Sequence, residues 1–255
     1  MKIRILGCSG GIGRGLRTTS LLVDDDILID AGSGLGDLTL DEMAKIRHVF
    51  LTHTHLDHVA FLPLLVDSIF ERIIDPIVIH GQAETIKGLK EHIFNWTIWP
   101  DFARLPQEDR PVMRYQVERA GGVCKVDGRR FELIPMNHIV PTVGYRVESA
   151  AGKSFAFTGD TTTNDSFWNA LNAHEQLDLL FLEVAFSNED EELSRTARHY
   201  CSNSMAADIV KLKHTPQIYL THHKPAEGKR IFQEVRRLVK DRDIKQLKNN
   251  LIFTL

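Results

Sequence analysis

The sequence predicts an α/β fold built from mixed layers, and three observations support this prediction. The chain has 255 residues, of which 43% are hydrophobic, so it can bury a large core. Short β-type runs crowd its first third, and later strands alternate with helical patterns. No Ser/Gly/Pro-rich linker and no repeat divides it. We therefore expect one domain over residues 1–255, with helices around a largely antiparallel core.

Short apolar or β-branched runs bounded by turn signals are the predicted strands. They span residues 2–6, 20–23, 27–29, 48–51, 77–79, 130–135, 143–147, 154–158, 179–183 and 217–221. Helical periodicity predicts helices over 59–70, 84–94, 165–171, 204–212 and 228–239. The acidic run 189–192 is typical of a solvated loop.

Charge and cysteine usage exclude several classes of protein. The 31 Lys and Arg residues face 34 Asp and Glu residues, a net charge of −3, which argues against a broad surface for duplex DNA. Cys8, Cys124 and Cys201 form no CxxC pair and predict neither a disulfide framework nor a thiolate zinc site. The first residues show no apolar h-region before their first charges, and no uninterrupted apolar stretch approaches about 18 residues. We expect a soluble cytoplasmic protein with no membrane partner.

Histidine clustering is the strongest local signal. His53, His55 and His58 fall within the segment Thr-His-Thr-His-Leu-Asp-His that begins at Thr52. Alternate residues of an extended segment share one side, so His53 and His55 can converge on one metal ion, while Asp57 and His58 face a neighbouring one. The alternative is a set of surface histidines with Asp57 as a helix cap. Imidazole and carboxylate donors suit Zn²⁺, Mn²⁺ or Fe²⁺.

Three further candidate ligands follow separate predicted strands. His138, Asp160 and His222 each come shortly after a strand ends. A single His or Asp at such a place is more often a turn or cap residue. Together, however, they occupy corresponding places where one rim of a sheet scaffold could gather them around metal ions.

The order of these residues resembles the metallo-β-lactamase superfamily of two-metal hydrolases. The resemblance spans nearly the whole chain and implies that superfamily's four-layer αββα sandwich. It implies that one metal ion is held by His53, His55 and His138, the other by Asp57, His58 and His222, with Asp160 bridging and Asp30 orienting the ligand loop.

Other stretches resemble the class II cyclic-nucleotide phosphodiesterases within that superfamily. The most discriminating is Phe-Asn-Trp-Thr-Ile-Trp-Pro-Asp over 94–101, in a short helical and aromatic insertion at about 80–115. The segment Leu-Thr-His-His-Lys-Pro over 220–225 also matches, but His223 stands where Met is expected. That departure leaves His222 and His223 both open as the ligand, and spacing from the strand favours His222.

The resemblance implies hydrolysis of 3′,5′-cyclic nucleotides, cAMP or cGMP, to 5′-monophosphates. The expected cofactors are two divalent ions, with Zn²⁺ preferred over Mn²⁺ or Fe²⁺, and a hydroxide bridging them attacks phosphorus. Asp57 and His199 are the expected catalytic residues. His199 resembles the auxiliary histidine of superfamily phosphodiesterases, which faces the phosphate, and is a candidate for transition-state stabilisation or general-acid work. The alternative is a solvated histidine at a helix start.

Two tryptophans offer a possible substrate contact. Trp96 and Trp99 could stack on a purine, because aromatic faces bind bases with little sequence preference. Equally, they could anchor the insertion to the domain or to a second subunit, which makes a homodimer plausible.

Three other functions compete with cyclic-nucleotide hydrolysis. A ribonuclease Z-like enzyme would cut RNA at its 3′ end, but residues 80–115 carry five basic and five acidic side chains, a poor counter-surface for tRNA. Nucleic acid is therefore an unlikely partner. A β-lactam or thioester hydrolase would also use Asp57 as a ligand of the second metal ion. That function does not explain the Trp-Pro-Asp and His-His-Lys-Pro stretches. A non-enzymatic binding module would have a closed metal site and no turnover.

Overall fold

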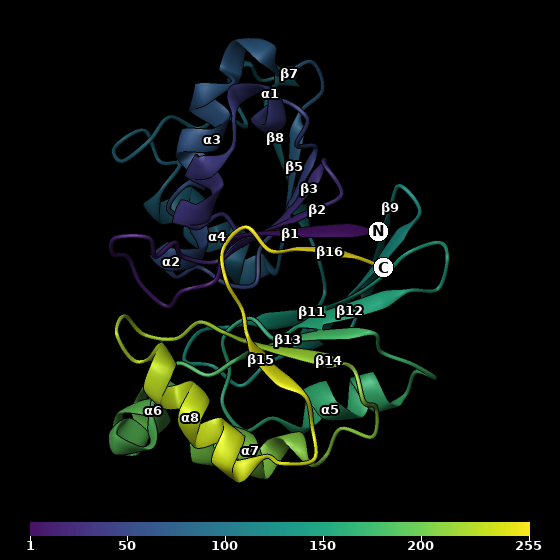
Figure 1. Cartoon of the computed structure of the whole chain (residues 1–255). Helices are drawn as coiled ribbons and strands as arrows, with labels where there is room; N and C mark the ends of the chain where they lie inside the picture. The colour runs from purple at the N-terminus through teal and green to yellow at the C-terminus, as the bar shows by residue number, and fades with distance from the viewer.

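Two seven-stranded sheets packed face to face form the centre of the molecule (Figure 1). The structure is a computed structural model that describes residues 1–255. Helices α1, α3 and α4 cover the outer face of the first sheet, and α5, α7 and α8 cover that of the second (Figure 1). The layers therefore follow the predicted αββα order, which confirms the expected fold class.

The first sheet holds the N-terminal strands and the last strand of the chain. Its spatial order is β16 (Ile252–Thr254), β1 (Lys2–Gly7), β2 (Ser20–Val23), β3 (Ile27–Ile29), β4 (His48–Phe50), β5 (Ile77–Gly81) and β8 (Met113–Val117). A separate pair, β6 (Pro106–Gln107) and β7 (Arg110–Pro111), lies within the region predicted as an insertion.

The second sheet holds the C-terminal half of the chain. Its spatial order is β15 (Ile244–Gln246), β14 (Gln217–Thr221), β13 (Leu179–Glu183), β12 (Ser154–Phe157), β11 (Val143–Glu148), β10 (Arg129–Pro135) and β9 (Val123–Val126). Its central strands are almost wholly buried, as expected for strands covered on both faces.

Both sheets are mixed, so the expectation of a largely antiparallel core was wrong. In the first sheet β16, β1, β2 and β3 pair antiparallel, and β3, β4, β5 and β8 pair parallel. The second sheet repeats the pattern, antiparallel from β9 to β12 and parallel from β12 to β15. The parallel halves arise because helices connect these strands as crossovers.

The helix predicted over 59–70 is broken into shorter pieces. The helical segments are α1 (Leu40–Met43), α2 (Leu56–Val59), α3 (Leu62–Ser68), α4 (Ala83–His92), α5 (Asp165–Asn172), α6 (Glu191–Ala197), α7 (Ser202–Ile209) and α8 (Gly228–Leu238), with short 3₁₀ turns at Ser33–Asp37, Phe70–Arg72 and Asn188–Asp190. Pro63 lies in the first turn of α3, where its missing N–H costs nothing, so the chain restarts a helix there.

Three apolar clusters hold the layers together. One lies between the first sheet and α3 and α4, one between the second sheet and α5, α7 and α8, and the third between the two sheets. Strand β16 returns the end of the chain to the first sheet, where the amino group of Met1 donates to the carbonyl of Leu255 at 2.8 Å. None of the helices combines the length and the apolar character that crossing a bilayer requires.

Candidate two-metal centre

The candidate ligands meet where strands of the two sheets end at one edge of the sandwich. His53, His55, Asp57 and His58 follow β4, and His55 is the N-cap of α2. From the second sheet, His138 follows β10, Asp160 follows β12 and His222 follows β14. Strands β3 and β4 run parallel, as do β12, β13 and β14, so the carboxyl ends of each set lie at one rim.

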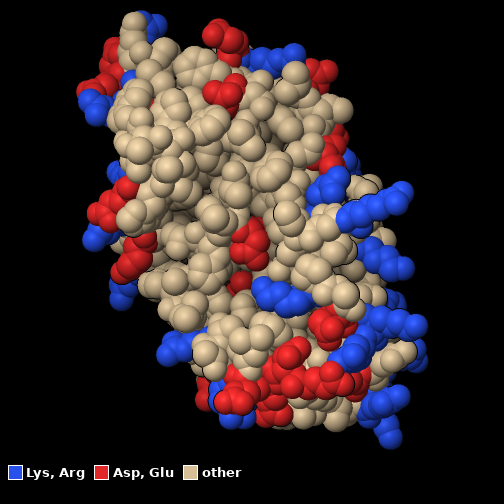
Figure 2. Space-filling model, turned by 90° about the vertical axis from the view of Figure 1, so that its left-hand side faces the viewer, with Lys and Arg blue, Asp and Glu red and all other residues tan.

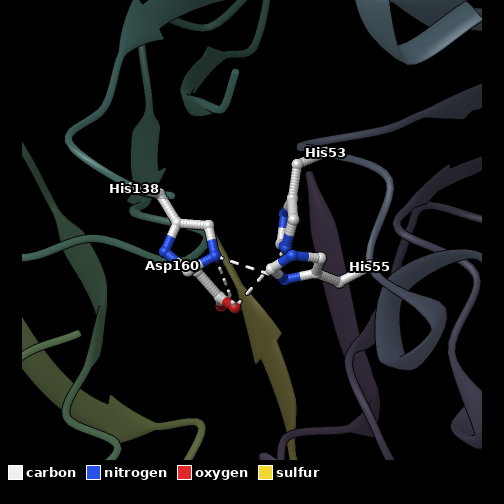
Figure 3. A group of neighbouring side chains, drawn as sticks. All are labelled: His53, His55, His138 and Asp160. Carbon is white, nitrogen blue, oxygen red and sulfur yellow. Dashed lines mark hydrogen bonds and ion pairs between the residues drawn. The ribbon is translucent and has the colours of Figure 1, made fainter. Parts of the chain in front are cut away.

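One cluster joins three imidazoles and a carboxylate. The possible ligand atoms of His53, His55, His138 and Asp160 lie within 4.8 Å of one another. His53 Nε2 is 3.5 Å from Asp160 Oδ2, and His138 Nε2 is 3.3 Å from His55 Nδ1. The three rings surround the carboxylate of Asp160, with His138 approaching from the side opposite His55 (Figure 3).

A second cluster shares Asp160 with the first. Asp57, His58, Asp160 and His222 also place their ligand atoms within 4.8 Å of one another. His58 Nε2 lies 3.3 Å from Asp160 Oδ1, and His222 Nε2 lies 3.3 Å from Asp160 Oδ2 and 3.6 Å from Asp57 Oδ2. The structure thus gathers all seven residues predicted as metal ligands, in the two groups that the resemblance implied.

Four buried polar atoms at this place have no hydrogen-bond partner. They are Nε2 of His53, His58 and His222, and Oδ1 of Asp160. Buried polar atoms are rarely left unpaired, because desolvation without a hydrogen bond is costly. Convergent imidazole nitrogens and carboxylate oxygens are the donors that Zn²⁺, Mn²⁺ and Fe²⁺ accept, so the residues fit a pair of divalent cations.

Burial keeps most of these imidazoles neutral, the form that binds metal. It lowers the pKa of His53 well below its usual value, that of His138 to about 4 and that of His222 to about 3. His58 differs: burial alone would lower its pKa, but Asp160 and Asp30 outweigh burial and raise it. The negative charge around His58 is the charge that a cation at this position would balance.

Asp30 anchors the loop that carries the ligands His53 to His58. Its Oδ2 is 2.7 Å from Nδ1 of His58, and its Oδ1 accepts a hydrogen bond from the backbone N–H of Thr52 at 2.8 Å. The Thr52 hydroxyl also donates to Asp30. With Nδ1 bonded to Asp30, His58 turns Nε2 toward Asp160. The role of Asp30 was expected from the sequence, whereas that of Thr52 was not.

Backbone geometry at three positions of the site is unusual for residues other than glycine. Asp30, Arg198 and His222 have φ of 58°, 52° and 64°. Left-handed backbone of this kind costs of order 1–3 kcal/mol for an L-residue and persists where its surroundings enforce it. At His222 the backbone N–H donates to the carbonyl of Cys8 at 2.8 Å, which holds the strained turn.

His199 lies beside the shared carboxylate and is held by Glu183. Its Nδ1 is 2.5 Å from Oε1 of Glu183, and its ring stacks on that of His222 at 5.5 Å between centroids. Nε2 of His199 makes no hydrogen bond to protein. Burial would lower the pKa of His199, but Glu183 outweighs burial and raises it. Glu183 is the last residue of β13, so the end of this strand also contributes to the site.

The two adjacent histidines after β14 point in different directions. His222 directs Nε2 at Asp57 and Asp160. His223 instead places Nδ1 2.7 Å from the carbonyl of Val184, and it belongs to neither cluster. The geometry therefore matches the ligand that strand spacing favoured.

A family comparison agrees with this geometry. A Beta-lactamase superfamily domain matches residues 25–223, which include every residue of the two clusters. The chain belongs to this superfamily. Its curated superfamily relatives include a protein of Yersinia pestis named a probable 3′,5′-cyclic-nucleotide phosphodiesterase, 25% identical over 92% of this chain and 80% of the relative. A ribonuclease Z of Haloarcula marismortui is likewise 25% identical, over 87% of this chain and 86% of the relative.

Solved structures show the superfamily fold over the whole chain. Unliganded yeast PDE1 superimposes with a TM-score of 0.82 at 18% identity, covering 99% of both chains. The metallo-β-lactamase fold protein YhfI of Bacillus subtilis gives 0.76 at 18% identity, covering 99% of this chain and 98% of the other. Human tRNase Z, short form, gives 0.72 at 17% identity, covering 100% and 99%. At these identities the likeness shows the metallo-β-lactamase fold alone.

The two tryptophans predicted as a stacking surface differ in their surroundings. Trp96 is 57% exposed, whereas Trp99 is partly buried against the core cluster that contains Phe94 and Phe102. Nε1 of Trp99 is buried without a partner. Only Trp96 therefore presents an open ring, and Trp99 anchors the aromatic segment to the domain.

Proposed function

We propose that this chain is a two-metal phosphodiesterase that hydrolyses 3′,5′-cyclic nucleotides to 5′-monophosphates. The observation that carries the proposal is the pair of His/Asp clusters joined by Asp160, with His199 and Glu183 beside them. Two bound divalent ions would activate a water molecule and neutralise the non-bridging oxygens of a phosphodiester. No broad basic surface is needed for such a small substrate.

His199 is suited to protonate the leaving oxygen. Glu183 accepts the proton of Nδ1, so it orients the ring and favours a second proton on the unpartnered Nε2. As water attacks phosphorus and the bond from phosphorus to the 3′ oxygen breaks, the Nε2 proton passes to that oxygen. Positioned proton donors of this kind contribute about 10²–10⁴-fold to rate.

Asp57 is suited to accept a proton from the attacking water. Its side chain is 26% exposed, whereas that of Asp160 is 2% exposed, so Asp57 is the more accessible of the two carboxylates. Burial alone would raise the pKa of Asp57, but the charge of His58 outweighs burial and lowers it, which keeps the carboxylate ionised. We assign Asp57 the combined role of ligand and proton acceptor.

A ribonuclease acting on RNA 3′ ends is the second candidate. The ribonuclease Z of Haloarcula marismortui is 25% identical to this chain, the same identity as the probable cyclic-nucleotide phosphodiesterase of Yersinia pestis. On the face where α2 and α6 lie, Lys and Arg gather along the right-hand edge and Asp and Glu across the lower end, while charged groups of the upper half lie mainly at its rim (Figure 2). The neutral 80–115 region still argues for the smaller substrate.

Assays of the purified chain on cAMP, cGMP, bis(p-nitrophenyl) phosphate and a tRNA precursor separate the candidates. We expect metal-dependent turnover of a cyclic nucleotide and of the model diester. Cleavage of the tRNA precursor without cyclic-nucleotide hydrolysis would replace the first candidate with the second. No turnover of any diester in metal-loaded protein would favour a binding module.

The same proposal includes the metal ion, the base contact, the oligomeric state and the location. We propose that the ion is Zn²⁺, that the base stacks on Trp96, and that the protein is a cytoplasmic homodimer. The three cysteines are free, which suits a reducing compartment. Metal analysis, a structure with bound nucleotide and light scattering test the first three, respectively.

A further inference from the structure

A second group of metal-type donors lies between the two sheets, outside the centre described above. His48 on β4 and His80 on β5 come from the first sheet, Glu118 directly follows β8, and Cys124 is on β9 of the second sheet. His80 Nδ1 is 2.8 Å from Oε1 of Glu118 and 4.0 Å from Sγ of Cys124. The ligand atoms of these last three residues lie within 4.8 Å of one another.

The registers of both sheets place His80 opposite Cys124. In the first sheet Phe50 pairs with His80, and in the second Phe131 pairs with Cys124. The ring of Phe50 stacks on that of Phe131 at 4.0 Å and on that of His80 at 4.1 Å. The Phe50–His80 pair of the first sheet therefore faces the Phe131–Cys124 pair of the second sheet. Stacking on Phe50 fixes the plane of the His80 imidazole.

The charge of this cluster is not balanced by protein cations. The Glu118 side chain is 14% exposed, and its one ion pair is with His80. Burial lowers the pKa of His80, so this imidazole is a poor counter-charge for the carboxylate. A mostly buried carboxylate without a cationic partner is costly, and such charges are usually paired or bound to metal.

We propose that His80, Glu118 and Cys124 bind a divalent cation of the Zn²⁺ type at a site separate from the two-metal centre. A thiolate, an imidazole and a carboxylate are all donors that Zn²⁺ accepts, while the sulfur disfavours Mg²⁺ and Ca²⁺. Binding breaks the S–H bond of Cys124, whose proton leaves to solvent as the metal–sulfur bond forms. Carboxylate and thiolate together then balance the charge of the ion.

His48 orients the metal ligand from the other side of its ring. Nδ1 of His48 lies 3.0 Å from Nε2 of His80, so His80 can donate its Nε2–H there and present Nδ1 to the ion. A surface hollow of about 360 Å³ is lined by Glu118 together with Gln82, Val117, Arg119 and Ala120, so this ligand of the proposed site borders solvent. The bound ion would tie the two sheets together.

Cobalt substitution tests this site directly, because none of the donors of the two-metal centre is a thiolate. The full chain is stripped with a chelator, refilled with Co²⁺ and followed by absorption and metal analysis. We expect about three ions per chain and a thiolate-to-cobalt charge-transfer band in the near ultraviolet. Cys124→Ala should lose that band and about one ion, and it should retain phosphodiesterase activity, since Cys124 belongs to neither of the two clusters.

Cys8→Ser is the matched control, because Cys8 is also a half-buried free thiol but lies outside the cluster. It should keep the band and the metal content of the wild type. Absence of the band in wild-type protein that has taken up about two ions would overturn the site, whether or not the variants fold. A band that survives Cys124→Ala would also overturn it.

Discussion

Oε1 of Glu183 lies 2.5 Å from Nδ1 of His199, a contact between residues on different elements of the second half of the chain. Glu183 ends β13, and His199 follows α6. Because the carboxylate occupies one ring nitrogen, the other is left for substrate. This relationship orients the His199 ring for the proton transfer that we propose.

Replacing His199 with Ala should lower kcat for cyclic-nucleotide hydrolysis by about 100- to 10,000-fold, the usual contribution of a positioned acid. Glu183→Gln should give a smaller loss, because it removes the carboxylate that orients the ring. Metal content, measured in parallel, should not change in either variant. His92→Ala, at an exposed position at the end of α4, is the control. Unchanged turnover in His199→Ala would remove this residue from the mechanism.

Asp30→Asn should weaken metal binding by about 10- to 100-fold, because it removes the carboxylate that orients His58. Titration of the stripped protein with Zn²⁺, followed by calorimetry, measures this change. Asp25→Asn, on the exposed β2–β3 turn, should bind like the wild type. Equal affinities in all three proteins would mean that Asp30 is only structural.

The neighbouring histidines give a test of ligand identity. His222→Ala should lose metal from the second cluster and lose activity, because its Nε2 faces Asp57 and Asp160. His223→Met, which restores the residue expected from the resemblance, should keep both metal content and turnover. If His223→Met instead loses a metal ion, the two residues have been assigned in the wrong order.

Asp208 should make stability depend on pH. Burial alone would raise its pKa, but hydrogen bonds from Lys211, Tyr200 and Trp168 outweigh burial and lower it. A lowered folded-state pKa stabilises the fold above the unfolded value of about 3.9, and this contribution is lost as pH falls through the folded value. Asp208→Asn should therefore reduce the free energy of unfolding by about 1–3 kcal/mol near pH 7, with a smaller difference in acid.

Urea unfolding of the wild type and variant between pH 3 and about 7 measures the Asp208 effect. Asp165→Asn is the control, because Asp165 pairs with the same Lys211 but its side chain is 77% exposed. Such exposed pairs contribute about 0–1 kcal/mol. Identical pH profiles for wild type and Asp208→Asn would contradict the assignment.

Local pattern was enough to predict much of the fold. The runs at β2, β3, β13 and β14 are short, apolar and bounded by turns, and their predicted bounds agree with the structure. Strand β8 was missed, because Arg114 and Gln116 alternate with apolar residues on an exposed sheet edge. Helix α6 was mistaken for an acidic loop, although Glu191 and Glu192 in its first turn favour the positive end of a helix.

The site was predictable where ligands are close in sequence or resemble a known order. The contact between Glu183 and His199 and the anchoring of Asp30 by Thr52 depend on tertiary packing, which no spacing reveals. The same holds for Cys124. Its isolation in the sequence argued against a thiolate metal site, yet pairing across two sheets brings it to His80.

The two sheets have the same strand pattern, and each comes mainly from one half of the chain, so the metal centre forms only when the two halves pack together. Each half of the chain supplies an incomplete set of donors: His53, His55, Asp57 and His58 from the first, His138, Asp160 and His222 from the second. Each of the two clusters draws its donors from both halves of the chain. Tight metal binding therefore requires that segments as far apart in sequence as His53 and His222 have already come together. Folding of the sandwich and binding of the metal ions are thus coupled.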